Sequence, residues 1–117
     1  MSPSPTDYLR HILDEMTFLA LESSKLSRED FLRDEVRKRG FVRSLEIIGE
    51  AAKQIPEYIR RQCPQVPWRS MAGLRDKLIH AYFGVDYEIV WDVAANEVSI
   101  LLPAIRELLA SIGKNTP

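Results

Sequence analysis

Apolar residues recur along most of the chain at intervals of three and four, the spacing that places side chains on one face of an α-helix. The first apolar stripe consists of Leu9, Ile12, Leu13, Met16 and Leu19. Ser4 or Thr6 is a suitable N-terminal cap for this helix, and the stripe fades near Lys25. The pattern therefore predicts a first helix that begins after the prolines at positions 3 and 5 and ends near Lys25.

A second stripe predicts one long helix from about Ser27 to Ile55. Ser27 is followed three residues later by Asp30, in a spacing like that of a capping box. The apolar positions of this helix are Phe41, Leu45, Ile48, Ala52 and Ile55. Gly49 lies inside the stripe, and a glycine costs about 1 kcal/mol relative to alanine in a helix interior. We therefore expect another helix to approach the backbone closely at Gly49.

Proline and glycine positions divide the second half of the chain. Pro56 either ends the long helix or starts a short one that runs through Ile59. After a proline-containing turn, a further helix is expected from Trp68 to about Tyr82, with Gly84 ending it. Its apolar residues are Met71, Leu74, Leu78 and Ile79.

Asp86 is a good cap for the last helix. The apolar stripe of that helix contains Ile89, Val90, Val93, Ile100, Leu101, Ile105 and Leu108. No stretch alternates apolar and polar residues over a useful length, so the pattern favours an all-α fold. We expect one domain over residues 1–117, an antiparallel bundle of four to five helices with frayed tails at residues 1–6 and 112–117.

The length of 117 residues fits one ordinary domain, and 45% hydrophobic residues are enough for a core. A formal net charge of −1 excludes a strongly basic protein that coats nucleic acid. The single cysteine, Cys63, excludes an internal disulfide framework. Neither an apolar run of roughly 20 residues nor a secretory signal is visible, so we expect a cytoplasmic protein without membrane contact. No zinc-ligand spacing or glycine-rich phosphate loop is present, and we expect neither a metal nor a cofactor.

Positive charge gathers in the middle of the chain. Residues 33–61 carry eight basic and five acidic side chains. Arg33 and Arg37 are one helical turn apart, as are Arg39 and Arg43. The pattern is more typical of a solvated helix face with ion pairs, and the functional alternative is a surface that follows phosphates. Charge alone does not separate the two interpretations.

Candidate chemistry centres on His80, because His11 has no partner nearby in the sequence and is taken as a surface residue. Asp76 lies four residues before His80 and shares its helix face, where a carboxylate can orient the imidazole. Arg75 lies five residues before His80, about 140° away around an ideal helix. The two side chains meet only if the helix ends or bends near His80, or if two copies pack around a twofold axis.

A structural alternative explains the same residues without catalysis. Arg75 would pair with an acid such as Glu46 or Glu50, and His80 would be a cation at the C-terminal end of its helix.

The stretch RSLEIIGEAAKQIPEYIRRQCPQVPWRSMAGLRDKLIHAYFGVDYEIVWDV, from Arg43 to Val93, closely resembles HepT-like toxins of the HEPN superfamily. The blocks IIGEA, PW, GLRDKLIHAYFGVD and IVW match in order and spacing, and the resemblance covers roughly residues 36–110. The HEPN motif is an arginine, a polar residue, a few variable positions and a histidine. It falls on Arg75, Asp76 and His80, and the tyrosine that follows the histidine in the family is Tyr82. The family often has asparagine after the arginine, and Asp76 adds negative charge near a phosphate site.

The resemblance implies an α-helical homodimer whose two Arg–His motifs meet in a cleft at the interface. It further implies a metal-independent endoribonuclease, the toxin of a type VII toxin–antitoxin module. The antitoxin would be a small MntA-like nucleotidyltransferase that transfers AMP to Tyr82. With RNA as substrate, Arg39, Arg43 and Lys77 are the candidates for RNA contacts. The alternatives are a HEPN module that partners a nucleotidyltransferase or binds nucleotides without cutting RNA, and a plain helical interaction protein.

Overall fold

The computed structural model describes residues 3–81 and 84–114, with side chains up to Ile112, and it is helical without strands over these residues. The elements are α1 (Pro5–Ser24), α2 (Arg28–Arg33), α3 (Glu35–Lys53), α4 (Glu57–Arg60), α5 (Trp68–Ile79), α6 (Tyr87–Asp92), a π-helical turn η1 (Val93–Glu97) and α7 (Val98–Lys114). The predicted all-α class is therefore confirmed. None of the described helices is long and apolar enough to cross a membrane.

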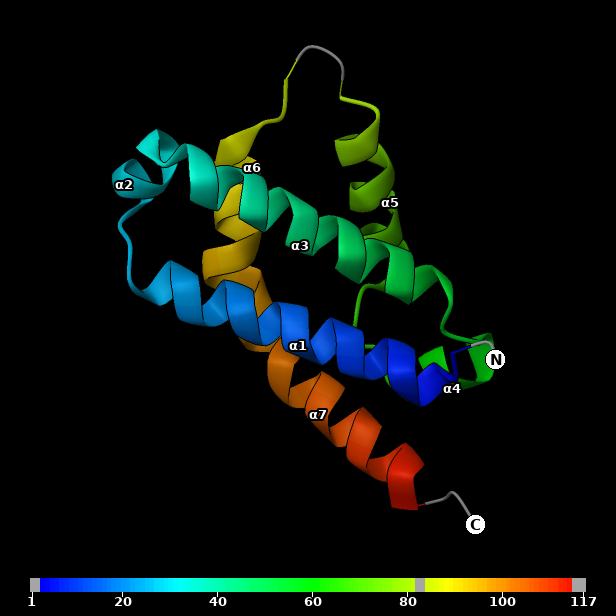
Figure 1. Cartoon of the computed structure of the whole chain (residues 1–117). Helices are drawn as coiled ribbons and strands as arrows, with labels where there is room; N and C mark the ends of the chain where they lie inside the picture. The colour runs from blue at the N-terminus through cyan, green and yellow to red at the C-terminus, as the bar shows by residue number, and fades with distance from the viewer. Residues whose placement is uncertain (1–2, 82–83, 115–117) are drawn as a thin grey trace.

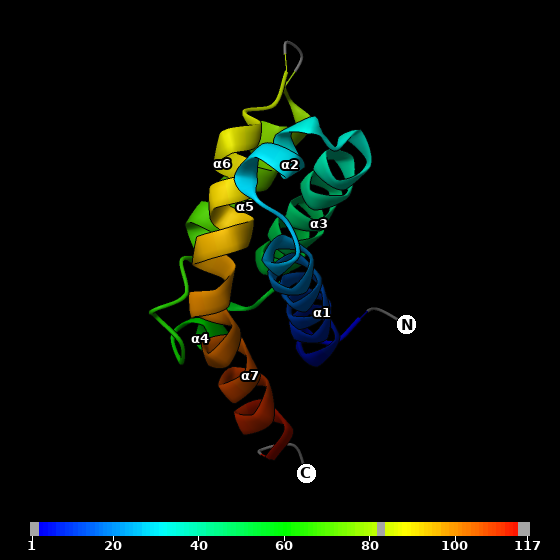
Figure 2. The same ribbon diagram turned by 90° about the vertical axis from the view of Figure 1, so that its left-hand side faces the viewer.

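Helix α3 is the central element of the arrangement. It packs against α1 on one side and against α5 on the other, and α1 also packs against α7. Helices α1 and α3 run in opposite directions (Figure 1). Helices α6, η1 and α7 follow one another as a single column beside the other helices (Figure 2).

Polar side chains start the helices where the sequence predicts them. Ser4 Oγ accepts a hydrogen bond from the Asp7 backbone N–H at 3.2 Å, and an Asp7 carboxylate oxygen accepts one from the Ser4 N–H at 2.9 Å. This reciprocal capping box begins α1 at Pro5. Asp86 caps α6 by accepting from the backbone N–H groups of Glu88 and Ile89. Because α1 starts at Pro5 and α7 reaches Lys114, helix extends into both segments that were expected to be frayed tails.

The prediction of one long helix from Ser27 to Ile55 is wrong. Ser27 does begin a helix, but α2 ends at Arg33, and Asp34 adopts an extended conformation with φ −98° and ψ 96°. The Asp34 carboxylate then accepts a hydrogen bond from the Arg37 backbone N–H at 3.0 Å and starts α3. The segment is therefore two helices because it contains two N-terminal caps.

The apolar stripes of α1 and α3 form the core, as predicted. All five predicted positions of the second stripe are buried, and on α1 only Leu13 remains partly exposed. Phe31 of α2 joins them and stacks against Phe41 and Trp91, with ring centroids 4.8 and 5.3 Å apart. Phe31 therefore connects α2, α3 and α6 at one end of the molecule.

The stripe of α5 is less completely covered. Met71, Leu74 and Leu78 are half-buried, and Ile79 is 43% exposed. On the last helical column Ile89 is 52% and Ile100 75% exposed, although both belong to the predicted stripe. An apolar strip along α5 and the last helices thus stays open in the single chain.

Gly49 allows α3 and α5 to touch backbone to backbone. A Cβ atom built on Gly49 would lie 2.2 Å from Arg75 Cβ and 2.7 Å from the Met71 carbonyl oxygen. Both distances are far shorter than any van der Waals contact, so only glycine fits at this crossing. The expected close approach at Gly49 is confirmed, and its partner is the helix that carries Arg75.

We predict that Gly49→Ala lowers the free energy of unfolding by about 1–3 kcal/mol, the usual cost of overpacking a tight contact. The matched control is Gly40→Ala on the same helix, where a new Cβ would meet only Phe18 Cζ at 4.0 Å. The control is expected to be neutral or to stabilise by up to about 1 kcal/mol through helix propensity. Urea denaturation followed by circular dichroism measures both variants. Equal stability of the two variants would contradict the close contact.

Candidate functional site

Helix α5 ends at the residue before His80. Its last residue is Ile79, and His80 is the C-terminal cap with φ −103° and ψ 13°. The helix therefore ends near His80, which is one of the conditions for Arg75 and His80 to meet, although it stops short of the predicted end at Tyr82. The proposed AMP acceptor Tyr82 lies outside the described residues. Gly84 follows with φ +129°, a conformation that glycine adopts without strain.

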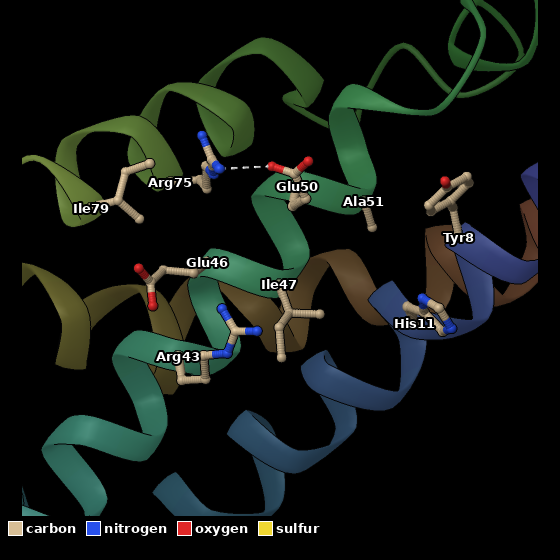
Figure 3. Close-up of a pocket in the computed structure, with 9 residues that line it drawn as sticks. All are labelled: Tyr8, His11, Arg43, Glu46, Ile47, Glu50, Ala51, Arg75 and Ile79. Atoms are coloured by element: carbon tan, nitrogen blue, oxygen red, sulfur yellow. Dashed lines mark ion pairs between the residues drawn. The ribbon is translucent and has the colours of Figure 1, made fainter. Parts of the chain in front are cut away.

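Arg75 is held by two carboxylates. Its guanidinium lies 3.0 Å from a Glu50 carboxylate oxygen and 3.0 Å from an Asp76 carboxylate oxygen. The side chain nevertheless keeps 26% of its surface exposed. The ion pair with Glu50, drawn as a dashed line in Figure 3, is one that the structural alternative predicts. It fixes the guanidinium above α3 at the close approach of the two helices.

Asp76 bridges two cations, Lys53 and Arg75, and is not hydrogen-bonded to His80. Its carboxylate accepts hydrogen bonds from Lys53 Nζ at 2.7 Å and from Arg75 at 3.0 Å. These hydrogen bonds, with Lys53 first, lower the pKa of Asp76 below its ordinary value. Within the described part of the chain, no hydrogen bond or ion pair joins His80 to Arg75 or Asp76. In a single chain the imidazole of His80 is thus exposed and not hydrogen-bonded to the arginine.

Arg75 forms part of the wall of a pocket of about 270 Å³ between α1, α3 and α5, which we call the Arg75 pocket. Its lining consists of Tyr8, His11, Arg43, Glu46, Ile47, Glu50, Ala51, Arg75 and Ile79. Figure 3 shows the side chains of α3 in the middle, with Arg75 on one side and the two rings of α1 on the other. Two arginines, two glutamates and two aromatic rings therefore share one small depression.

His11 and Tyr8 line this pocket, although the sequence did not predict a role for either residue. His11 is exposed, as expected, but it stands beside Tyr8, with ring centroids 6.2 Å apart and ring planes at 83°. The local signal was an aromatic residue three positions before a histidine, which places both on one helix face. Their partners on α3 and α5 are distant in sequence, so local spacing did not point to them.

The predicted RNA-contacting residues fall in different places. Arg43 lines the Arg75 pocket, whereas Lys77 lines another cavity between α5 and α6. Arg39 is exposed on α3, one turn before Arg43. Arg37 pairs with Asp34 at 2.9 Å and with Glu22 at 3.4 Å, so the ion-pair interpretation holds for this arginine. The structure therefore brings Arg43 together with Arg75 and leaves Lys77 elsewhere.

Over residues 3–81 and 84–114 there is no group of three His, Cys, Asp or Glu side chains that could hold a metal ion. The titratable groups of the Arg75 pocket comprise one imidazole, one phenol, two carboxylates and two guanidinium groups. Such a set can bind a phosphate through the arginines and can accept hydrogen bonds through the glutamates.

Comparison with known proteins bears on the same region. The model of the family described as "Ribonuclease HepT-like" matches residues 8–111, which include both walls of the Arg75 pocket. A protein of Caldanaerobacter subterraneus subsp. tengcongensis named "Putative RNase" is 49% identical over 106 residues, 91% of this chain and 95% of the relative. A protein of Thermococcus cleftensis named "Probable ribonuclease HepT" is 43% identical over 108 residues, 92% of this chain and 98% of the relative. No solved structure matches the chain.

The family match extends over most of the described fold, from the first turn of α1 to the last turns of α7. The relatives are covered almost end to end, so the similarity concerns the whole domain and not a short motif. This chain belongs to the HepT-like ribonuclease family.

Proposed function

We propose that the protein is an endoribonuclease toxin that cuts RNA with Arg75 and His80. The observation that carries the proposal is the position of Arg75, anchored by Glu50 yet open to a pocket in a chain of the HepT-like ribonuclease family. The exposed imidazole at the end of α5 supplies a side chain that can accept or donate a proton.

The chemistry follows from the two side chains. The 2′-OH of a ribose attacks the adjacent phosphorus, while a histidine accepts its proton or protonates the leaving 5′ oxygen. The products are a 2′,3′-cyclic phosphate and a 5′-OH. Arginine offers a fixed fork of donors to the phosphorane oxygens, on which negative charge builds in the transition state. In this route Arg75 provides the charge stabilisation and Asp76, which contacts it, helps to hold the guanidinium in place.

A second copy of the chain completes the proposed site. No hydrogen bond joins Arg75 to His80 within one chain, so two Arg–His motifs facing each other across a twofold axis would supply the missing geometry. The open apolar strip on α5 and the last helices supports this, with Ile79, Ile89 and Ile100 exposed. A cavity of about 440 Å³ between Met71, Leu74, Val93 and Leu101 adds further apolar surface there. Burial of this surface against a second copy would stabilise the dimer.

The proposed neutralising partner is an MntA-like nucleotidyltransferase that transfers AMP to Tyr82. The nearest described residues before and after this segment are Ala81, which is half-buried, and Gly84, which is exposed. AMP attached in this segment would place a negative phosphate close to His80 and oppose the binding of RNA.

We predict that Arg75→Ala and His80→Ala each reduce RNA cleavage by about a hundredfold or more, because each removes a proton-transfer or charge-stabilising group. The assay uses purified protein and single-stranded RNA in EDTA, and the cleaved ends are identified as 2′,3′-cyclic phosphate and 5′-OH. Arg75→Lys keeps the charge but loses the fork of donors, so it is expected to be impaired as well.

The matched control is Arg69→Ala, which removes an exposed arginine from the same helix. It is expected to cleave at the wild-type rate, and thermal unfolding of each variant verifies its fold. Wild-type cleavage by a folded Arg75→Ala or His80→Ala variant would refute the role of that residue. Absence of cleavage by the wild type would favour the non-catalytic binding module.

We expect the protein to be a homodimer, because the apolar strip is open in one chain. Sedimentation at micromolar concentration should give twice the chain mass. Ile100→Asp, which places a charge on that strip, should shift the equilibrium to monomer and reduce cleavage in parallel. A wild-type monomer that retains cleavage would contradict the shared site.

We expect Tyr82 to accept AMP when the protein is expressed with an MntA-like nucleotidyltransferase. Intact-mass and peptide mass spectrometry should show adenylyl increments on the peptide that contains Tyr82, and the modified protein should cleave RNA more slowly. The control is Tyr82→Phe. A chain without increments, or increments that persist in Tyr82→Phe, would refute Tyr82 as the acceptor.

A further inference from the structure

The Arg75 pocket has a second wall that the proposed chemistry does not use. Tyr8 and His11 project from α1 on the side opposite Arg75 (Figure 3). Tyr8 is half-buried and meets the His11 ring edge to face, whereas the His11 ring itself is exposed. The packed tyrosine thus supports an aromatic ring that is open to a ligand.

Between the two walls, α3 supplies an apolar floor and unpaired charges. Ile47 and Ala51 line the pocket together with Arg43 and Glu46. Within the described part of the chain, Arg43 and Glu46 have no hydrogen bond or ion pair, in contrast to Glu50, which pairs with Arg75. One free cation and one free carboxylate therefore remain at the floor of the pocket.

This mixture of groups selects among ligands. A purely anionic ligand such as inorganic phosphate would gain from Arg43 and Arg75 but would be repelled by Glu46. A nucleotide unit has a part for each group: a flat base for an aromatic ring, hydroxyl and amino donors for a carboxylate, and a phosphate for a guanidinium. A volume of about 270 Å³ lies just below the usual range of small-molecule pockets, roughly 300–1,000 Å³, so the pocket suits one nucleotide unit and not several.

We propose that the Arg75 pocket binds the ribonucleotide next to the cleaved phosphate, with its base stacked on His11 and its phosphate side at Arg43 and Arg75. This inference rests on the proposed function, because it places in the pocket the nucleotide that is attached to the phosphate bound by Arg75. Every base has a face that can stack, so the pocket accepts all four bases with little discrimination.

The test measures binding separately from cleavage. The probe is a 2′-O-methyl tetranucleotide, which lacks the attacking 2′-OH and is not cut. The chain contains two histidines, so its imidazole region in a proton NMR spectrum is simple, and His11→Ala assigns the two rings. We expect the probe to shift the His11 signals upfield through base stacking. His11→Ala should weaken binding roughly five- to a hundredfold, the range for loss of one base–aromatic stack.

Matched variants separate stacking from loss of charge or fold. His11→Phe keeps an aromatic ring and should bind within about threefold of the wild type. Tyr58→Ala removes a 63% exposed tyrosine from α4, outside the pocket, and should bind as the wild type does. Arg43→Gln should weaken binding more than Arg106→Gln, which removes an exposed arginine from α7.

Each alternative result overturns the inference. Unchanged binding by His11→Ala, or failure of His11→Phe to restore binding, would show that the pocket is not a stacking site. Equal losses for Arg43→Gln and Arg106→Gln would show that the phosphate does not lie at Arg43. Because the probe cannot be cut, a wild type that binds it in the expected way but cleaves no RNA would refute the proposed function alone. A wild type that cleaves RNA but binds normally without His11 would refute the inference alone.

Discussion

The contact between α3 and α5 at Gly49 determines where the remaining groups of the site can lie. Because Gly49 has no side chain, the backbones of α3 and α5 approach closely, and the Cβ atom of Arg75 lies against the backbone of α3. The guanidinium therefore reaches Glu50, one residue beyond the glycine, and opens into the pocket that α1 completes. A larger residue at Gly49 would push α5 outward and separate Arg75 from both its anchor and the rings of α1.

Local signals in the sequence predicted the elements that depend on neighbouring residues. Ser4, Ser27 and Asp86 cap helices because their side chains bond to backbone groups two or three residues away. The same kind of signal at Asp34 was overlooked among the charged residues around it, although it divides the predicted long helix. The second apolar stripe starts at Phe41, after the break at Asp34. It therefore does not indicate whether the residues before Asp34 continue along the same helix axis.

The composition of the pocket was beyond local reasoning. His11 was taken as an isolated surface residue because its partners belong to α3 and α5, and neither the crossing angle nor the register of α1 on α3 follows from periodicity. Glu50 was named as one of two possible partners of Arg75, and only the close approach at Gly49 selects it. The geometry that relates Arg75 to His80 was the hardest feature to predict from the sequence, since the two residues are close in sequence but no hydrogen bond joins them within one chain.

The ion pair between Glu50 and Arg75 has a consequence for the salt dependence of RNA binding. A phosphate that reaches this arginine meets a cation whose charge the Glu50 carboxylate already offsets, so fewer of the counterions condensed on the RNA are released than at an unpaired cation. Arg75 then contributes more to the orientation of the bound phosphate, through its fork of N–H donors, than to the overall electrostatic attraction of the RNA. The logarithm of RNA affinity should therefore fall less steeply with the logarithm of salt concentration than the number of cations facing the RNA suggests.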